Sequence, residues 1–210
     1  METIEFFQLE KNKDDIRKTV LTNLTKMLTE RKLLDENSLA NNINMMLNFK
    51  PDDETYTISG LIGQKNEGQD NIIIVKIYDQ KVISISKQSP IAEFVTKNKD
   101  KKMFVIFKEI NTKSQQYIIN ISPTAEIFKE YNLMINLIDY VFVPRYEKLN
   151  EYSDDFINFR DIYHCKKRNI PKLLVTDPLA RYYGLKRGDI VRIIRASETT
   201  GLSSYYRLVV

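Results

Sequence analysis

Apolar positions near the start of the chain recur at the spacing of one helix face. Asp14 or Asp15 can cap a helix whose apolar residues follow this spacing to about Leu33. A second apolar face begins near Asp35 and stops before Pro51, because the residue preceding a proline avoids the helical region. The pattern predicts two amphipathic helices in succession.

The pattern then changes to short runs of β-branched and aromatic residues. These runs predict strands at Tyr56–Ile62, Asn71–Tyr78, Lys81–Ser86, Met103–Lys108 and Tyr117–Ile121, with a two-residue hairpin turn at Asp79-Gln80. Proline at a first helical position predicts a helix from Ser89-Pro90 to about Asn98 and a shorter one from Ser122-Pro123 to about Lys129. Helices around a mixed sheet make residues 1–137 an α/β domain.

Residues 138–210 are predicted to form a second, small α+β domain, reached through the apolar segment Leu133–Val143, a buried strand or a connector. Ser153 caps a helix that ends near Tyr163. The remaining elements are a strand at Leu173–Val175, a helix at Pro178–Tyr183 with Asp177 as its cap, a turn at Lys186–Asp189, and strands at Ile190–Arg195 and Tyr205–Val210. Gly184, Gly188 and Gly201 stand where the backbone needs a positive φ.

Charge divides the chain at the same place. Residues 1–137 carry 19 Lys and Arg against 19 Asp and Glu, whereas residues 138–210 carry 13 against 9. Eight arginines follow position 144 and only Arg17 and Arg31 precede it. Arginine forms planar, paired hydrogen bonds with carboxylates and phosphates, so this excess indicates either a solvated basic face or a surface for an acidic partner or nucleic acid.

Composition excludes several classes of protein. The 42% hydrophobic and 29% charged residues are ordinary for a globular protein, and no apolar run approaches the roughly 20 residues that a membrane span needs. The single cysteine, Cys165, cannot form an internal disulfide, and the first residues lack a basic stretch followed by an apolar core. We therefore expect a cytosolic or nuclear protein.

The segment DPLARYYGLKRGDIVRIIRASETTG, followed by YYRLVV, resembles the carboxyl-terminal domain of the fifth common subunit of eukaryotic-type nuclear RNA polymerases and of its archaeal equivalent. Val143-Pro144 and Ile170-Pro171 lie where that family has its own prolines. Met103–Phe107 and the segment NISPTA at Asn120–Ala125 more faintly resemble the amino-terminal jaw domain of the longer, eukaryotic-type subunits.

The resemblance implies a non-catalytic subunit of a DNA-dependent RNA polymerase, without cofactor or metal. The carboxyl-terminal domain would dock on the largest subunit, and the jaw, with Pro123, would lie beside downstream duplex DNA. A cellular form would work in the nucleus, and a viral form in the virion or a cytoplasmic factory. The residues assigned to the largest-subunit interface are Pro144, Pro171, Asp177, Pro178, Arg181, Tyr182, Tyr183, Lys186, Arg187, Arg192, Arg195, Glu198, Tyr206 and Arg207.

Arginine interleaved with tyrosine is typical of protein interfaces, and a surface that follows a DNA backbone would carry more lysine. Two alternatives remain. Asp52, Asp79 and Lys81 formally match the two carboxylates and lysine of a metal nuclease, which would hold Mg²⁺. The turn at Lys186–Asp189 also occurs in small β-modules that bind RNA on their own.

Overall fold

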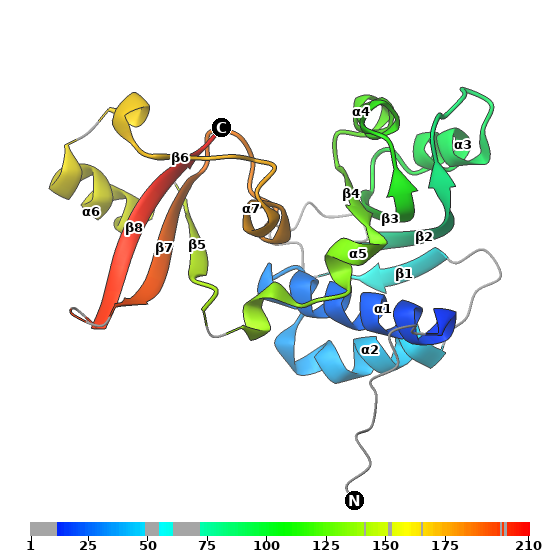
Figure 1. The fold of residues 1–210 in the computed structure, drawn as a ribbon, viewed down its shortest axis with the longest axis horizontal. Helices are drawn as coiled ribbons and strands as arrows, with labels where there is room; N and C mark the ends of the chain where they lie inside the picture. The colour runs from blue at the N-terminus through cyan, green and yellow to red at the C-terminus, as the bar shows by residue number, and fades with distance from the viewer. Residues whose placement is uncertain are drawn as a thin grey trace, which may run out of the picture. The chain divides into compact units, whose positions relative to one another are not determined.

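The computed structural model describes residues 12–48, 55–60, 72–140, 142–150, 153–164, 166–197, 199 and 201–210 (Figure 1). The chain divides into two compact units after Ile135. Each unit contains one four-stranded sheet with both parallel and antiparallel neighbours, so the protein is mixed α/β. In the described residues no helix is long and apolar enough to cross a bilayer.

The first unit is a sheet in the order β1-β2-β3-β4, with β1 antiparallel and the other strands parallel. The strands are β1 (Thr55–Ser59), β2 (Ile72–Val82), β3 (Lys102–Ile110) and β4 (Ala125–Lys129). The helices are α1 (Lys13–Glu30), α2 (Leu39–Asn48), α3 (Pro90–Lys97), α4 (Thr112–Ile121) and α5 (Glu130–Leu133), with a 3-10 turn, η1, at Glu36–Ser38.

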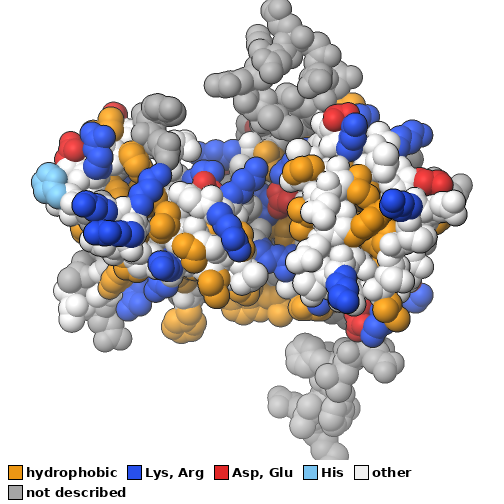
Figure 2. Space-filling view, turned by 90° about the horizontal axis from the view of Figure 1, so that it is seen from above, with side chains coloured by type: hydrophobic (Ala, Val, Ile, Leu, Met, Phe, Trp, Pro, Cys, Tyr) orange, Lys and Arg blue, Asp and Glu red, His pale blue; other side chains and the backbone are white. Residues whose placement is uncertain are grey.

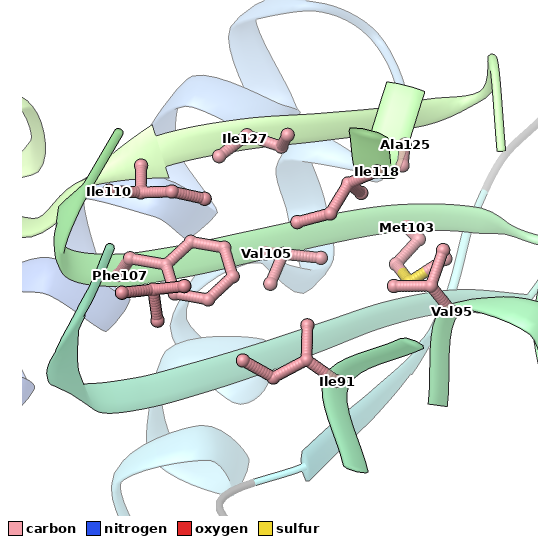
Figure 3. Close-up of a cluster of buried hydrophobic side chains, with 10 residues drawn as sticks. Ile91, Val95, Met103, Val105, Phe107, Ile110, Ile118, Ala125 and Ile127 are labelled. Atoms are coloured by element: carbon pink, nitrogen blue, oxygen red, sulfur yellow. The ribbon is translucent and has the colours of Figure 1, made fainter. Parts of the chain in front are cut away.

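Helices α3 and α4 connect successive parallel strands and cover one face of the sheet, while α1 and α2 lie on the other side (Figure 1). Val95 and Ile118 meet Met103, Val105 and Phe107 of the central strand β3 in one buried cluster (Figure 3). All five residues are fully buried. Burial on both faces explains why β3 has an unbroken apolar run from Met103 to Phe107, as central parallel strands do.

Two of the predicted elements in this unit were wrong in type. Tyr117–Ile121, predicted as a strand, is the second half of helix α4, because Ser114 and Ile118 lie one turn apart on its buried face. The segment predicted as a helix after Pro123 is strand β4. Ser122 closes α4, so Pro123 follows a helix end, where proline is also common, instead of opening a new helix.

The hairpin predicted at Asp79-Gln80 was also wrong. Strand β2 continues through both residues to Val82, with an irregularity in its pairing to β3 between Tyr78 and Lys81. An extra residue in a strand interrupts the hydrogen-bond ladder locally without reversing the chain. Asp79 and Gln80 are polar, as turn residues often are, so the sequence alone predicted a turn at this irregularity. The predicted strand at Lys81–Ser86 therefore shrinks to the end of β2, followed by an irregular link to α3.

The second unit is a sheet in the order β5-β7-β8-β6, in which only β6 and β8 are parallel. The strands are β5 (Arg145–Leu149), β6 (Lys172–Leu173), β7 (Ile190–Ser197) and β8 (Gly201–Val209). The helices are α6 (Asp154–Tyr163) and α7 (Pro178–Tyr182), with 3-10 turns η2 at Leu137–Asp139 and η3 at Lys167–Asn169. Strands β7 and β8 extend the predicted ones by two and four residues toward their turn.

Side chains alternate across this sheet. Val191, Ile193 and Val209 form a core with α7 on one face, and Ile190 and Leu149 form another with Phe159 of α6 on the opposite face. The segment Leu133–Val143 is no strand in its described part: it ends α5 and contains η2.

Candidate assembly surface

Asp177 and Pro178 lie at the start of α7, where each has a local structural role. The Asp177 carboxylate accepts hydrogen bonds from the backbone N–H groups of Leu179 (2.9 Å) and Ala180 (3.3 Å), and Pro178 occupies the first helical position. Both residues therefore begin the helix, and Pro178 is also exposed. Asp177 is the more enclosed of the two, and its contacts give it a structural role within the unit.

The end of α7 turns on Gly184. Its φ is +64°, and two hydrogen bonds close the helix, from Gly184 N–H to Arg181 C=O (3.1 Å) and from Leu185 N–H to Ala180 C=O (2.9 Å). This pairing is the Schellman arrangement, which requires a left-handed residue and so favours glycine. Leu185 is then returned to the core, while Arg181 stays partly exposed.

The turn into β7 is held by Asp189. Its carboxylate accepts the Lys186 backbone N–H at 2.8 Å and pairs with the Lys148 ammonium at 3.0 Å, and Gly188 supplies a φ of +93°. The side chains of Lys186 and Arg187 are exposed on this turn. A short, fixed turn thus carries two cations into solvent.

The Arg192 side chain forms ion pairs within the second unit. It lies opposite Glu147 in the β5–β7 ladder, donates to that carboxylate at 2.9 and 2.6 Å, and reaches Asp155 of α6 at 3.3 Å. The hydrogen bond with Glu147 raises the pKa of the Arg192 guanidinium further, despite partial burial, which favours its neutral form. Arg192 therefore joins β5, β7 and α6, and its place on an interface stays a prediction.

Three of the predicted tyrosines also pack within the unit. Tyr182 is buried and donates its hydroxyl to the side-chain oxygen of Asn136 at 3.0 Å. Tyr183 stacks on Tyr146 with ring centroids 5.8 Å apart. Tyr206 lies 4.5 Å from the Phe159 ring of α6. Burial raises the pKa of Tyr146, with a smaller contribution from the Asp177 carboxylate.

The predicted residues that remain accessible form the candidate assembly surface. They are Pro171, Pro178, Lys186, Arg187, Arg195 and Arg207, all exposed. Arg195 lies over the ring of Tyr205 at 5.2 Å, although Tyr205 itself was not among the residues assigned to the interface. Figure 2, in which His164 marks this unit in pale blue, shows basic side chains as the commoner charged type on the visible face.

The other predicted interface residues differ in what the structure says of them. Pro144 is half-buried just before β5. Glu198 lies outside the described residues. Gly201, which was predicted as a turn residue with a positive φ and not as part of the interface, has a φ of +73° and opens β8.

Pro123 lies at the exposed tip of the turn between α4 and β4. Ser122 and Thr124, on either side, donate their hydroxyls to the backbone oxygens of Lys99 (3.2 Å) and Lys101 (3.1 Å). These bonds fix the turn beside the loop that precedes β3, whose Lys99 and Lys101 side chains are exposed. The sequence reasoning missed both lysines, because only the folded loop brings them to Pro123.

The residues of the nuclease alternative are engaged in ion pairs. Asp79 pairs with Lys13 at 2.8 Å, and Lys81 pairs with Glu109 at 2.5 Å, which lowers the pKa of the Glu109 carboxyl. Asp52 lies outside the described residues, and the structure groups no three His, Cys, Asp or Glu side chains suitable for a metal among the residues it describes.

Comparison with known proteins gives a family match whose bounds nearly coincide with the second unit. Residues 135–209 match the family model described as RNA polymerase Rpb5, C-terminal domain. The chain is 30% identical over 203 residues to DNA-directed RNA polymerase subunit 5 of Acanthamoeba polyphaga mimivirus, covering 97% of this chain and 96% of that one. The chain belongs to the RNA polymerase subunit 5 family.

Cellular members of this family are also similar. Subunit RPABC1 of DNA-directed RNA polymerases I, II and III from Caenorhabditis elegans is 28% identical over 163 residues, covering 77% of this chain and 75% of its own. The corresponding Dictyostelium discoideum subunit is 38% identical over 87 residues, which are 41% of this chain and 43% of its own. The protein is a DNA-directed RNA polymerase subunit with relatives in a virus and in eukaryotes.

Proposed function

We propose that this subunit is a non-catalytic scaffold of its polymerase, which docks on the largest subunit through residues 138–210. The observation that carries the proposal is the division of basic side chains in the second unit. Arg192 pairs with Glu147 and Asp155, whereas Arg187, Arg195 and Arg207 are exposed and pair with no carboxylate among the residues that the structure describes, although Arg207 also donates to the Lys172 backbone oxygen at 3.3 Å. Arginine and tyrosine, as in the Arg195–Tyr205 pair, are side chains that protein interfaces favour.

The assembly test uses the full chain, co-expressed with the largest subunit of its polymerase and recovered through a tag at about 0.5 M salt, where weak ionic contacts are screened. Wild type should retain the largest subunit, and Arg187→Glu with Arg207→Glu should lose most of it. Arg168→Glu is the matched control, because Arg168 is an exposed arginine of the same unit outside the candidate assembly surface. If wild type brings down no largest subunit, the docking proposal is wrong.

The first unit would serve as the jaw, with the Pro123 turn beside downstream duplex DNA. Support comes from Lys99 and Lys101, which the turn's own hydrogen bonds hold next to Pro123 and which have the charge to meet phosphates. In an assembled polymerase, Lys99→Glu with Lys101→Glu should weaken the hold on downstream DNA and make it less salt-dependent. Lys113→Glu, an exposed lysine on α4, is the control and should change neither property.

The cellular localisation of the subunit would depend on the polymerase that it joins. A cellular polymerase would place it in the nucleus, and a viral one in the virion or a cytoplasmic factory. Fluorescent tagging alongside the largest subunit tests this, since the two should be found in the same compartment.

A further inference from the structure

One edge of the second sheet is open. Strand β8 pairs with β7 from Gly201 to Leu208, but β6 covers its other side only at Leu208 and Val209. Within the residues that the structure describes, no other strand lies beside β8. In Figure 1 the half of β8 nearer the β7–β8 turn accordingly has no strand on its outer side.

Hydrogen bonds at the end of β8 show which backbone groups face that open edge. Leu208 and Val210 donate their N–H groups outward, to Pro171 and Leu173, each at 2.8 Å, whereas Val209 donates toward the β7 side, to Asp189, at 2.9 Å. Backbone groups in a strand alternate in direction. The N–H and C=O groups of Leu202, Ser204 and Tyr206 therefore point away from β7, along the uncovered edge.

Pro171 explains why β6 does not continue along this edge. Its carbonyl accepts from Leu208, and the next donor in a parallel ladder toward Tyr206 C=O would be the N–H of residue 171. Proline has no N–H, so the ladder ends there. A proline that the resemblance assigned to the interface thus leaves most of β8 available for a different strand.

Side chains beside the edge define what could pair with it. Arg207 and Tyr205 lie on one face of β8 with Arg195 over the tyrosine ring, and Leu202, on the other face, is 75% exposed. Strands β7 and β8 contain no Asp or Glu, and Arg192, the third arginine, is already paired with carboxylates. An incoming strand would meet two arginines without a carboxylate on either strand.

We propose that an extended segment of the largest polymerase subunit, carrying carboxylate side chains, adds to the outer edge of β8 as a further strand. Open edges readily accept a strand from another chain: backbone hydrogen bonds give the affinity, and alternate side chains give the selectivity. The inference rests on the proposed docking to the largest subunit and names the backbone that performs it.

The test is Ser204→Pro in the full chain, co-expressed with the largest subunit. Proline removes an N–H that faces the open edge and leaves the β7–β8 hydrogen bonds in place, so recovery of the largest subunit should fall by about tenfold or more. Ser204→Ala keeps the N–H and should behave as wild type. Equal recovery by Ser204→Pro and wild type would overturn strand addition while leaving docking intact, whereas failure of wild type itself would overturn docking.

Hydrogen exchange in the wild-type complex gives an answer even if Ser204→Pro fails to fold. The amides of Leu202, Ser204 and Tyr206 should exchange fast in the free subunit and become protected on assembly, more than the already paired amide of Val209. Unchanged exchange at all three would overturn the proposal. A dimer of the isolated chain that protects the same amides would instead make a second copy the occupant, and would also overturn it.

Discussion

The two sheets differ in how completely each is enclosed by its own chain. In the first unit, the central strand β3 is buried on both faces from Met103 to Phe107, between helices that come from the same unit. In the second, most residues of β8 are exposed or half-buried, and its outer edge is uncovered in the described residues. The comparison indicates that the first unit encloses its central strand in its own core, while the second leaves backbone and side chains of β8 exposed.

Charged groups follow the same division. In the first unit, the Glu126 carboxylate on β4 forms ion pairs with Arg31 at 2.7 Å and with Lys102 at 2.5 Å. The Arg31 side chain is only 5% exposed. In the second unit, Arg192 is paired internally but Arg187, Arg195 and Arg207 are exposed. The first unit therefore pairs the nearly buried Arg31 with a carboxylate of its own, and the second carries several exposed arginines.

The largest expected effect is on the core of the first unit. Phe107 is fully buried and stacks on Tyr78 at 5.1 Å, so Phe107→Ala should lower the free energy of unfolding by about 3–5 kcal/mol. Hydrogen exchange should show faster exchange in α3, α4 and β3, with residues of the second unit unchanged. Equal loss of protection in both units would instead show that they unfold together, and Ile83→Ala, at an exposed position, is the control.

The same variant has a spectroscopic signature. Burial raises the pKa of the Tyr78 hydroxyl to about 12, and removal of the stacked Phe107 ring admits water beside it. The pKa of Tyr78 should fall toward 10, its ordinary value, when measured by NMR titration of labelled tyrosine.

The next effect tests the buried charge of the first unit. Arg31→Met leaves Glu126 with Lys102 alone and removes a guanidinium that lies 5.7 Å from the Phe104 ring, so we expect a loss of about 2–3 kcal/mol in urea unfolding. The double variant Arg31→Met with Glu126→Gln should lose less than the sum of its two singles, because each single removes the same Arg31–Glu126 ion pair. A double variant as unstable as the sum of its singles would show that the two side chains do not interact.

Acid should remove the contribution of Glu126. Burial alone would raise the pKa of this carboxyl, but Arg31 and Lys102 outweigh burial and hold it below its ordinary 4.5. A lowered folded-state pKa means that the stabilisation is complete above the unfolded-state value and is lost as pH falls through the folded-state value. The difference in unfolding free energy between wild type and Glu126→Gln should therefore be constant from pH 7 to about 5 and shrink below about 4.

Sequence reasoning found local signals well and long-range ones poorly. The cap at Asp177, the proline at 178 and the glycine at 184 are each set by neighbouring backbone, so the short helix α7 could be predicted almost to the residue. In contrast, Tyr117–Ile121 has strand-like composition, and only its position over β3 and β4 makes it a helix. Tertiary burial overrides local propensity at such segments.

The candidate assembly surface shows the same limit. Residue type made arginine and tyrosine candidates for an interface, but it could not separate Arg192, which lies opposite Glu147, from Arg195, which is exposed. That distinction depends on strand register, which pairs residues 45 positions apart. The open edge of β8 was likewise hidden, since a strand order cannot be read from the strands themselves.

Substitutions of Arg192 and Arg195 should differ in their effect on stability, by an amount smaller than that expected for the core. Arg192→Met should destabilise the second unit by about 1.5–3 kcal/mol, because Glu147 and Asp155 lose a charged partner, whereas Arg195→Met should change stability by no more than about 0.5 kcal/mol. At a temperature where both variants are folded, the order should reverse for assembly: Arg195→Met should recover less of the largest subunit than Arg192→Met. Thermal unfolding and quantitative recovery on the same samples measure both properties, and an unstable Arg195→Met would place that side chain in the core.

The smallest expected effect compares the tip and the base of the Pro123 turn. Ser122 is fully buried and donates to Lys99 C=O, so Ser122→Ala should cost about 1–2 kcal/mol, whereas Pro123→Ala changes an exposed residue and should cost about 0.5 kcal/mol through the greater freedom of the unfolded chain. Both substitutions lie in the first unit, and docking is proposed for the second, so both variants should assemble as wild type does. If Pro123→Ala nevertheless weakened the hold of the assembled polymerase on downstream DNA, a change that small in stability could not account for it, and contact at the tip would be the remaining cause. If DNA holding instead followed the stability of the turn, with Ser122→Ala the weaker variant, then the turn would matter only for the placement of Lys99 and Lys101.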